Sequence, residues 1–177
     1  DMAGGAAVLA TMLAVAQLDL PLHVVGLVPA TENLPSGSAY KPGDVLTALN
    51  GKTIEIISTD AEGRLVLADA LAYATRFNPK AVVDLATLTG ACVTALGLGV
   101  AAGVFSSDDD LLARLQAASR ASGERVWPLP LYDDYMDKIE SLTADMTNSG
   151  GRQGAAGSSA IFLNLFTGEC PWPQLDI

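Results

Sequence analysis

The stretch from residue 65 to residue 86 restricts the fold more than any other, because a helical pattern passes into a buried strand within it. Residues 65–75 carry apolar side chains at helical spacing, and Asn78-Pro79 ends that helix. Residues 81–86 are β-prone and almost wholly apolar, which is typical of a strand covered on both faces. The stretch therefore predicts alternating helices and buried strands.

An earlier pair of elements repeats this succession. Residues 3–18 are apolar nearly all round, which predicts a helix buried on most faces. Residues 22–28 form a continuous β-prone run, which predicts another buried strand. We therefore expect one α/β domain with a mixed, largely parallel central sheet flanked by helices on both faces. Half of the 177 residues are hydrophobic, which is enough apolar material for a full core.

A β-hairpin is predicted between these two pairs. Residues 44–49 and 52–57 are β-prone runs on either side of Asn50-Gly51, a dipeptide that favours a tight two-residue turn. A turn of fixed length also fixes the register of the two strands. The loop that follows residue 57 therefore starts from a rigid base.

Local signals predict the remaining elements. Ser107 or Asp108 caps a helix that runs to about Ser122, where Gly123 stops it. The glycine-rich segment 149–159 lacks the lysine of a phosphate-binding loop, so we interpret it as a flexible connection. Short helices are predicted at 132–141 and 160–166, and a strand at 175–177.

A polar run, Ser58-Thr59-Asp60-Ala61-Glu62-Gly63-Arg64, separates the hairpin from the helix at 65–75. Residues i and i+2 of an extended chain project to the same side, so Asp60 and Glu62 can face one spot and attract a cation. On spacing alone, a charged loop in which Asp60 caps the following helix explains the run equally well.

The metal interpretation has definite chemistry. Carboxylates suit Mg²⁺, Mn²⁺ or Zn²⁺, and one carboxylate can bridge two ions about 3.5 to 4 Å apart. Arg64 stands at a helix start with unpaired amides, which together would form an anion site. Metals beside an anion site favour hydrolysis with charge developing on oxygen.

Residues 87–90, Thr-Leu-Thr-Gly, follow the predicted strand at 81–86. Ligands of α/β sheets bind beyond the carboxyl ends of the strands, so this edge is a candidate binding site. An ordinary turn at a strand end explains the same residues.

Composition narrows the possible ligands. Twenty acidic residues against ten basic ones give a net charge of -10. This charge disfavours binding to nucleic acid or to anionic membranes and favours the binding of a cationic ligand. His23 is expected in the core or at a strand end. Because it is the single histidine, zinc sites that need several histidines are excluded. Cys92 and Cys170 indicate reduced thiols of a cytosolic protein. Residues 85–105 are uncharged, but their four glycines favour buried strands over a membrane span.

The run at 59–71, TDAEGRLVLADAL, closely resembles the signature of the leucyl aminopeptidases, the two-metal cytosol aminopeptidases. Further blocks that look like this family stand in the family's order, at 1–7, 40–45, 86–91 and 175–177. Ser58 departs from the pattern, because the family usually has asparagine there.

This resemblance implies a metal-dependent aminopeptidase that removes the N-terminal residue of peptides, with a leucine-like preference. Two divalent ions, Mn²⁺ or Zn²⁺, would activate the attacking water. Asp60 and Glu62 would be metal ligands, with Glu62 bridging, and Asp1 would bind one ion. Arg64 would hold a bicarbonate that handles the proton of this water.

The resemblance also assigns a substrate edge and an assembly. Thr87, Thr89 and Gly90 would line the binding site of the peptide substrate and the pocket for its side chain. The enzyme would be cytoplasmic and homo-oligomeric, as a hexamer built around catalytic domains.

Part of the family's pattern is not found in these residues. The metal site also requires a lysine and an aspartate upstream of Asp1, a second lysine assists catalysis, and family members carry a separate N-terminal domain. Residues 1–177 are therefore expected to be a partial catalytic domain. The alternative is a non-catalytic segment with an incomplete metal site, which serves packing or assembly. A metal-dependent phosphatase would suit Arg64 but would leave the ordered family blocks unexplained.

Overall fold

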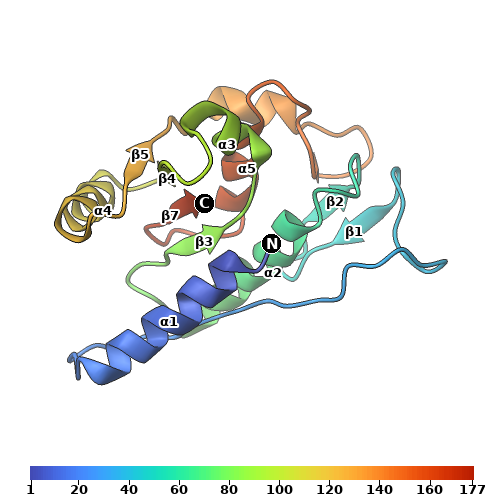
Figure 1. Ribbon diagram of the computed structural model, residues 1–177. Helices are drawn as coiled ribbons and strands as arrows, with labels where there is room; N and C mark the ends of the chain where they lie inside the picture. Colours follow the sequence, from blue (N-terminus) through green and yellow to red (C-terminus); the bar gives the residue numbers. More distant parts are fainter.

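The computed structural model describes residues 1–177. Five α-helices, two 3-10 helices and seven strands follow one another along the chain (Figure 1). Their order is α1 Ala3–Gln17, β1 Val45–Thr47, β2 Thr53–Glu55, α2 Gly63–Ala74, η1 Thr75–Phe77, β3 Asp84–Ala86, α3 Gly90–Leu96, β4 Ala102–Ser106, α4 Asp109–Ser122, β5 Val126–Pro128, η2 Asp133–Lys138, β6 Met146–Thr147, α5 Ala155–Asn164 and β7 Pro173–Asp176.

The strands form two sheets. The larger has the order β3-β7-β4-β5, in which β3 and β7 are parallel, β4 and β5 are parallel, and β4 and β7 are antiparallel. The smaller has the order β1-β2-β6, with β1 and β2 antiparallel and β2 and β6 parallel. The predicted α/β fold with a mixed, largely parallel sheet and flanking helices is confirmed.

The helices cover the larger sheet and link it to the smaller one. α1 packs on β3, α4 on β4 and β5, and α3 on β4, while α5 contacts α2, α3 and η2 (Figure 1). Helix α5 is the centre of the core because its residues 157–163 are all buried. The core cluster also includes Ile54 of β2, Leu71 of α2, Phe105 of β4 and Trp172 beside β7.

The hairpin forms as predicted, but its turn is longer than two residues. The Ala48 amide donates to the Lys52 carbonyl at 2.8 Å, so three residues close the loop. Gly51 has φ +90°, the left-handed conformation that such a loop requires at its last position. Asp69 of α2 accepts a hydrogen bond from the Leu49 amide at 2.7 Å, which ties the turn to α2.

The strand, helix and strand that follow the hairpin turn form in the expected order, but they are not a crossover within one sheet, because β2 belongs to the smaller sheet and β3 to the larger. Helix α2 ends at Ala74 and η1 at Phe77, and the next residue, Asn78, has φ +47° and precedes Pro79. Strand β3 is shorter than the predicted run 81–86. Residue 82 lies outside the ladder and donates its amide to the carbonyl of Pro171 at 3.0 Å.

The predicted strand at 22–28 is wrong, because no strand of this chain lies beside it to share a ladder. The segment instead runs extended along α1 (Figure 1), where a Cβ at Gly26 would lie 2.7 Å from Met12 Cγ. His23 is exposed, so its predicted place in the core is also wrong. For the same reason α1 is not buried on most faces: only Gly4 is buried, and Leu9 and Leu13 are 64% and 61% exposed.

Several smaller predictions shift at their boundaries. Helix α4 is confirmed, with Asp108 accepting a hydrogen bond from the Leu111 amide at 2.7 Å and Gly123 at φ +83°. The helix predicted at 132–141 is the 3-10 turn η2, and α5 begins earlier than residue 160. Cys92 and Cys170 are free thiols, as expected. No helix combines the length and apolarity that a membrane span requires.

Candidate metal centre and substrate edge

The two carboxylates of the polar run lie between β2 and α2. Asp60 is exposed in the connecting turn, and Glu62 is half-buried at the N-cap position of α2. No side chain caps α2, so the alternative role of Asp60 as its cap is wrong. Neither carboxylate is ion-paired, since the only ion pair in the structure joins Lys41 to Asp44 at 3.3 Å. Both groups are therefore free to bind a cation.

The Arg64 guanidinium is largely buried and lies close enough to Glu62 to interact with it electrostatically. Its Nη1 donates to the carbonyl of Asn148 at 3.0 Å, whereas its buried Nε has no partner. Burial lowers the pKa of Arg64, and the negative charges of Asp176 and Glu62 oppose that effect. A buried guanidinium with an unused donor is suited to an anion.

The chain start lies against the end of β3. A Cβ at Gly4 would overlap the carbonyl oxygen of Leu85, so only glycine allows α1 to approach β3 this closely. The approach places Asp1 beside the strand end, where Thr87 Oγ1 donates to Asp1 Oδ1 at 3.3 Å. The expected ligand Asp1 and the expected substrate edge are thus adjacent.

Asp176 of β7 holds the edge at 87–90 through three hydrogen bonds. Its carboxylate accepts hydrogen bonds from the Leu88 and Thr89 amides, both at 3.0 Å, and from Thr89 Oγ1 at 2.6 Å. Thr89 Oγ1 also accepts from the Cys92 amide at 3.1 Å and so caps α3. Burial raises the pKa of Asp176, while these hydrogen bonds and Arg64 lower it.

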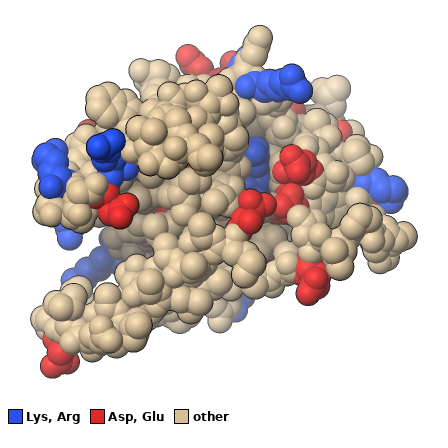
Figure 2. All heavy atoms as spheres, viewed as in Figure 1, with Lys and Arg blue, Asp and Glu red and all other residues tan.

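A series of pairwise interactions links Glu62 and Arg64 to the edge at 87–90 and to Asp1. Arg64 interacts electrostatically with both Glu62 and Asp176, and Asp176 binds the edge that contacts Asp1. Figure 2 shows acidic side chains near the middle of this face, around the point where Figure 1 marks the start of the chain. The carboxylates do not converge closely, since the structure contains no group of three or more acidic, histidine or cysteine side chains that could hold a metal ion.

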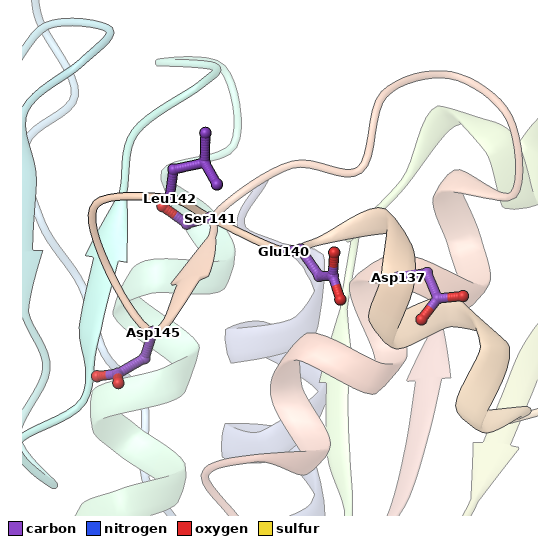
Figure 3. A pocket seen from close by; sticks show the side chains of 5 residues that line it. All are labelled: Asp137, Glu140, Ser141, Leu142 and Asp145. Atoms are coloured by element: carbon purple, nitrogen blue, oxygen red, sulfur yellow. The ribbon is translucent and has the colours of Figure 1, made fainter.

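A second acidic region lies away from this place. An open hollow of about 600 Å³ is lined by Asp137, Glu140, Ser141, Leu142 and Asp145 (Figure 3). Asp145 points away from the other two carboxylates in Figure 3, because it accepts hydrogen bonds from the amide and hydroxyl of Thr53, each at 2.8 Å. This hollow does not form a competing metal cluster.

The match to a known family decides where the chain belongs. Residues 1–177, the whole chain, match the model described as "Cytosol aminopeptidase family, catalytic domain". The chain belongs to the cytosol aminopeptidase family.

Curated cytosol aminopeptidases agree along the whole chain. The "Probable cytosol aminopeptidase" of Bordetella pertussis is 59% identical over 177 residues, which cover 100% of this chain and 35% of that protein. The protein of the same description from Syntrophotalea carbinolica is 56% identical, with the same coverage. The chain thus spans about a third of the length of these relatives.

Solved structures show the same fold. A mutant of tomato leucine aminopeptidase superposes with a TM-score of 0.93 at 44% identity, over 99% of this chain and 35% of that one. The bottromycin maturation enzyme BotP, in complex with Mn, superposes with a TM-score of 0.95 at 44% identity, over 100% of this chain and 40% of that one.

Sequence reasoning missed two residues of this cytosol aminopeptidase domain that touch the predicted site, Asp176 and Asn148. Asp176 lies in the middle of the predicted strand at 175–177, so an acidic side chain between apolar neighbours was a usable signal. Asn148 stands in a loop-like stretch, and only the pairing of β6 with β2 brings it to residues 57–61.

A buried carboxylate below the site predicts a pH dependence of stability. Asp84 of β3 accepts a hydrogen bond from Trp172 Nε1, but its Oδ1 has no partner. Burial raises the pKa of Asp84 from 3.8 to about 7, against the effect of the Trp172 bond and with the help of Asp176. The folded state then binds more protons than the unfolded chain between these two values, so stability falls as pH rises from 4 through 7.

Asp84→Asn, which keeps an acceptor for Trp172 and cannot ionise, is expected to remove this fall. Relative to the wild type, the free energy of unfolding of the variant should rise by up to about 4 kcal/mol between pH 4 and pH 8. Denaturant titrations at several pH values measure it. Parallel profiles for the two proteins would show that Asp84 does not titrate in this range.

Proposed function

We propose that the protein is a metal-dependent aminopeptidase that hydrolyses the N-terminal residue from peptides, with a leucine-like preference. The observation that carries the proposal is the buried Arg64 with its unused Nε, which interacts electrostatically with Glu62, while neither Glu62 nor Asp60 is tied up in an ion pair. Membership of the cytosol aminopeptidase family supports the same activity. Peptides with a free amino terminus are the proposed substrates.

The donor set suits divalent ions, Mn²⁺ or Zn²⁺, with Asp60, Glu62 and Asp1 as the ligands that this chain supplies. Oxygen donors of this kind are typical for such ions, and the similar enzyme BotP has been solved with Mn. When bound, the ions polarise the scissile carbonyl and lower the pKa of a water. Glu62, the one of these three carboxylates that interacts electrostatically with Arg64, is the proposed shared ligand.

Arg64 is proposed to hold a bicarbonate that takes up the proton of the attacking water. Its Nη1 is fixed by the Asn148 carbonyl, which holds the guanidinium in place, and its buried Nε has no partner in the chain. Because the group is buried, its attraction for an anion is little screened by solvent. The positive charge also opposes the negative charge that develops on the substrate oxygen.

The edge at 87–90 is proposed to bind the substrate. The Thr89 hydroxyl is already engaged by Asp176 and Cys92, so its contribution is to hold the backbone rather than to contact the substrate. Thr87 is exposed beside Asp1, and nothing lies within 4 Å of the position that a Cβ would take at Gly90. Thr87 and Gly90 thus leave room for a substrate side chain.

The location and the assembly of the enzyme are also proposed. The enzyme is proposed to work in the cytoplasm as a homo-oligomer, a hexamer of catalytic domains. A non-catalytic segment remains the competing function, because the structure contains no complete group of metal ligands.

One assay separates these functions. The full-length protein loaded with Mn²⁺ or Zn²⁺ is expected to cleave leucine p-nitroanilide and Leu-Gly-Gly but not their N-acetylated forms, because the free amine is part of recognition. The 177-residue chain is assayed in the same way, and cleavage by the full-length protein but not by this chain would assign the chain the non-catalytic function. Cleavage of the acetylated peptides, or no cleavage by the metal-loaded full-length protein, would overturn the proposal.

A further inference from the structure

Asn148 stands where the smaller sheet opens into the loop that carries the carboxylates. Strand β6 pairs with β2 through Ile54–Met146 and Glu55–Thr147, and the Asn148 amide donates the last ladder bond, to the Glu55 carbonyl at 2.9 Å. Beyond this point β2 leaves the sheet. The backbone of the departing chain therefore needs new hydrogen-bond partners.

The Asn148 side chain supplies those partners. Its Oδ1 accepts from the Ile57 amide at 2.8 Å and the Ser58 amide at 3.2 Å. Its Nδ2 donates to the Ser58 carbonyl at 2.7 Å, with a longer contact of 3.4 Å to the Ala61 carbonyl. One amide thus holds both ends of the segment in which Asp60 lies.

Asn148 is buried, which makes the loss of any of these hydrogen bonds costly. The residue is 0% exposed, so water cannot replace a lost partner without opening the structure. Its backbone carbonyl also accepts the bond from Arg64 Nη1 at 3.0 Å. A single residue therefore sets the position of both the carboxylate loop and the guanidinium.

We propose that Asn148 is the positioning residue of the metal loop, which fixes the backbone from Ile57 to Ala61 so that Asp60 and Glu62 stand ready for the ions. The role rests on the proposed function. Only an amide satisfies the site, because it accepts at one end and donates at the other. An aspartate would turn an acceptor toward the carbonyls of Ser58 and Ala61 and bury a charge.

The test compares three variants of the full-length protein. Asn148→Asp and Asn148→Ser alter the loop contacts, and Asp145→Asn is the matched control. Asp145 lies just before β6 and binds β2 through Thr53, but it does not touch the loop. Melting temperature, the Kd for Mn²⁺ added to metal-free protein, and kcat with KM for leucine p-nitroanilide are measured for each.

We expect both Asn148 variants to bind Mn²⁺ about 10- to 100-fold more weakly, with a lower kcat, as for other residues that orient ligands. The control should stay within about 2-fold of the wild type even where its melting temperature falls equally far. If Asn148→Asp does not fold, Asn148→Ser, which keeps one donor and one acceptor, decides the result.

Two results overturn the proposal in distinguishable ways. Unchanged Mn²⁺ affinity in a folded Asn148 variant, or an equal loss in Asp145→Asn, rejects the positioning role while the wild type still binds metal and cleaves substrate. A wild type that binds no Mn²⁺ and cleaves nothing rejects the proposed function, and the positioning role with it.

Discussion

Glu62→Ala in the full-length protein is expected to lose bound metal and to lower kcat/KM by at least about 100-fold, the upper range for residues that merely orient ligands. Glu62 is half-buried and interacts electrostatically with Arg64, but its carboxylate forms no ion pair and caps no helix amide. Metal content by elemental analysis and turnover of leucine p-nitroanilide measure the effect.

The control for Glu62 lies in the acidic hollow of Figure 3. The double variant Asp137→Asn and Glu140→Gln removes two acidic charges there, and it should keep metal and activity. Retention of both ions by Glu62→Ala would contradict the role of Glu62 as a shared ligand. Loss of metal in the double variant would move the site to the hollow.

Arg64→Ala is expected to lower kcat by about 100-fold or more while the metal content stays nearly unchanged. The guanidinium contacts the Asn148 carbonyl and a proposed anion, so its charge acts mainly on the transition state. Arg64→Lys, which keeps a charge but loses the planar fork, should recover only part of the activity.

An exposed cation provides the comparison for Arg64. Lys41 pairs with Asp44 on the surface, so Lys41→Ala should leave both kcat and metal content unchanged. An Arg64→Ala protein that loses its metal would contradict the assignment, because the arginine would then support the ligands rather than the chemistry.

The sequence predicted those parts of the fold whose causes are local. The cap at Asp108, the stop at Gly123 and the hairpin at Asn50-Gly51 each depend on residues a few positions apart. These local signals act in the same way whatever the rest of the chain packs against them. Such elements therefore appear where the pattern places them.

The failures concern partners that a local pattern cannot supply. Residues 22–28 have the composition of a buried strand, but a strand needs a neighbour, and this chain places none beside them. The apolar surface of α1 is exposed for the same reason. Periodicity shows which residues favour burial but not what covers them.

The candidate site divides in the same way. The spacing of Asp60, Glu62 and Arg64 within one loop is visible in the sequence, as is the strand end at 87–90. Asn148 and Asp176 were not predicted, since their hydrogen bonds join residues 84 to 91 positions apart. Only the strand pairings β2–β6 and β3–β7 bring them to the site.

The most direct measurement is anomalous X-ray diffraction from crystals of the active full-length protein loaded with Zn²⁺. We predict two ions at the loop between β2 and α2, with carboxylate oxygens of Asp60 and Glu62 about 2.0 to 2.2 Å from the metal. Glu62 should contact both ions and Asp1 one of them. Ions found only elsewhere in crystals of protein that cleaves leucine p-nitroanilide would contradict a metal centre at this loop.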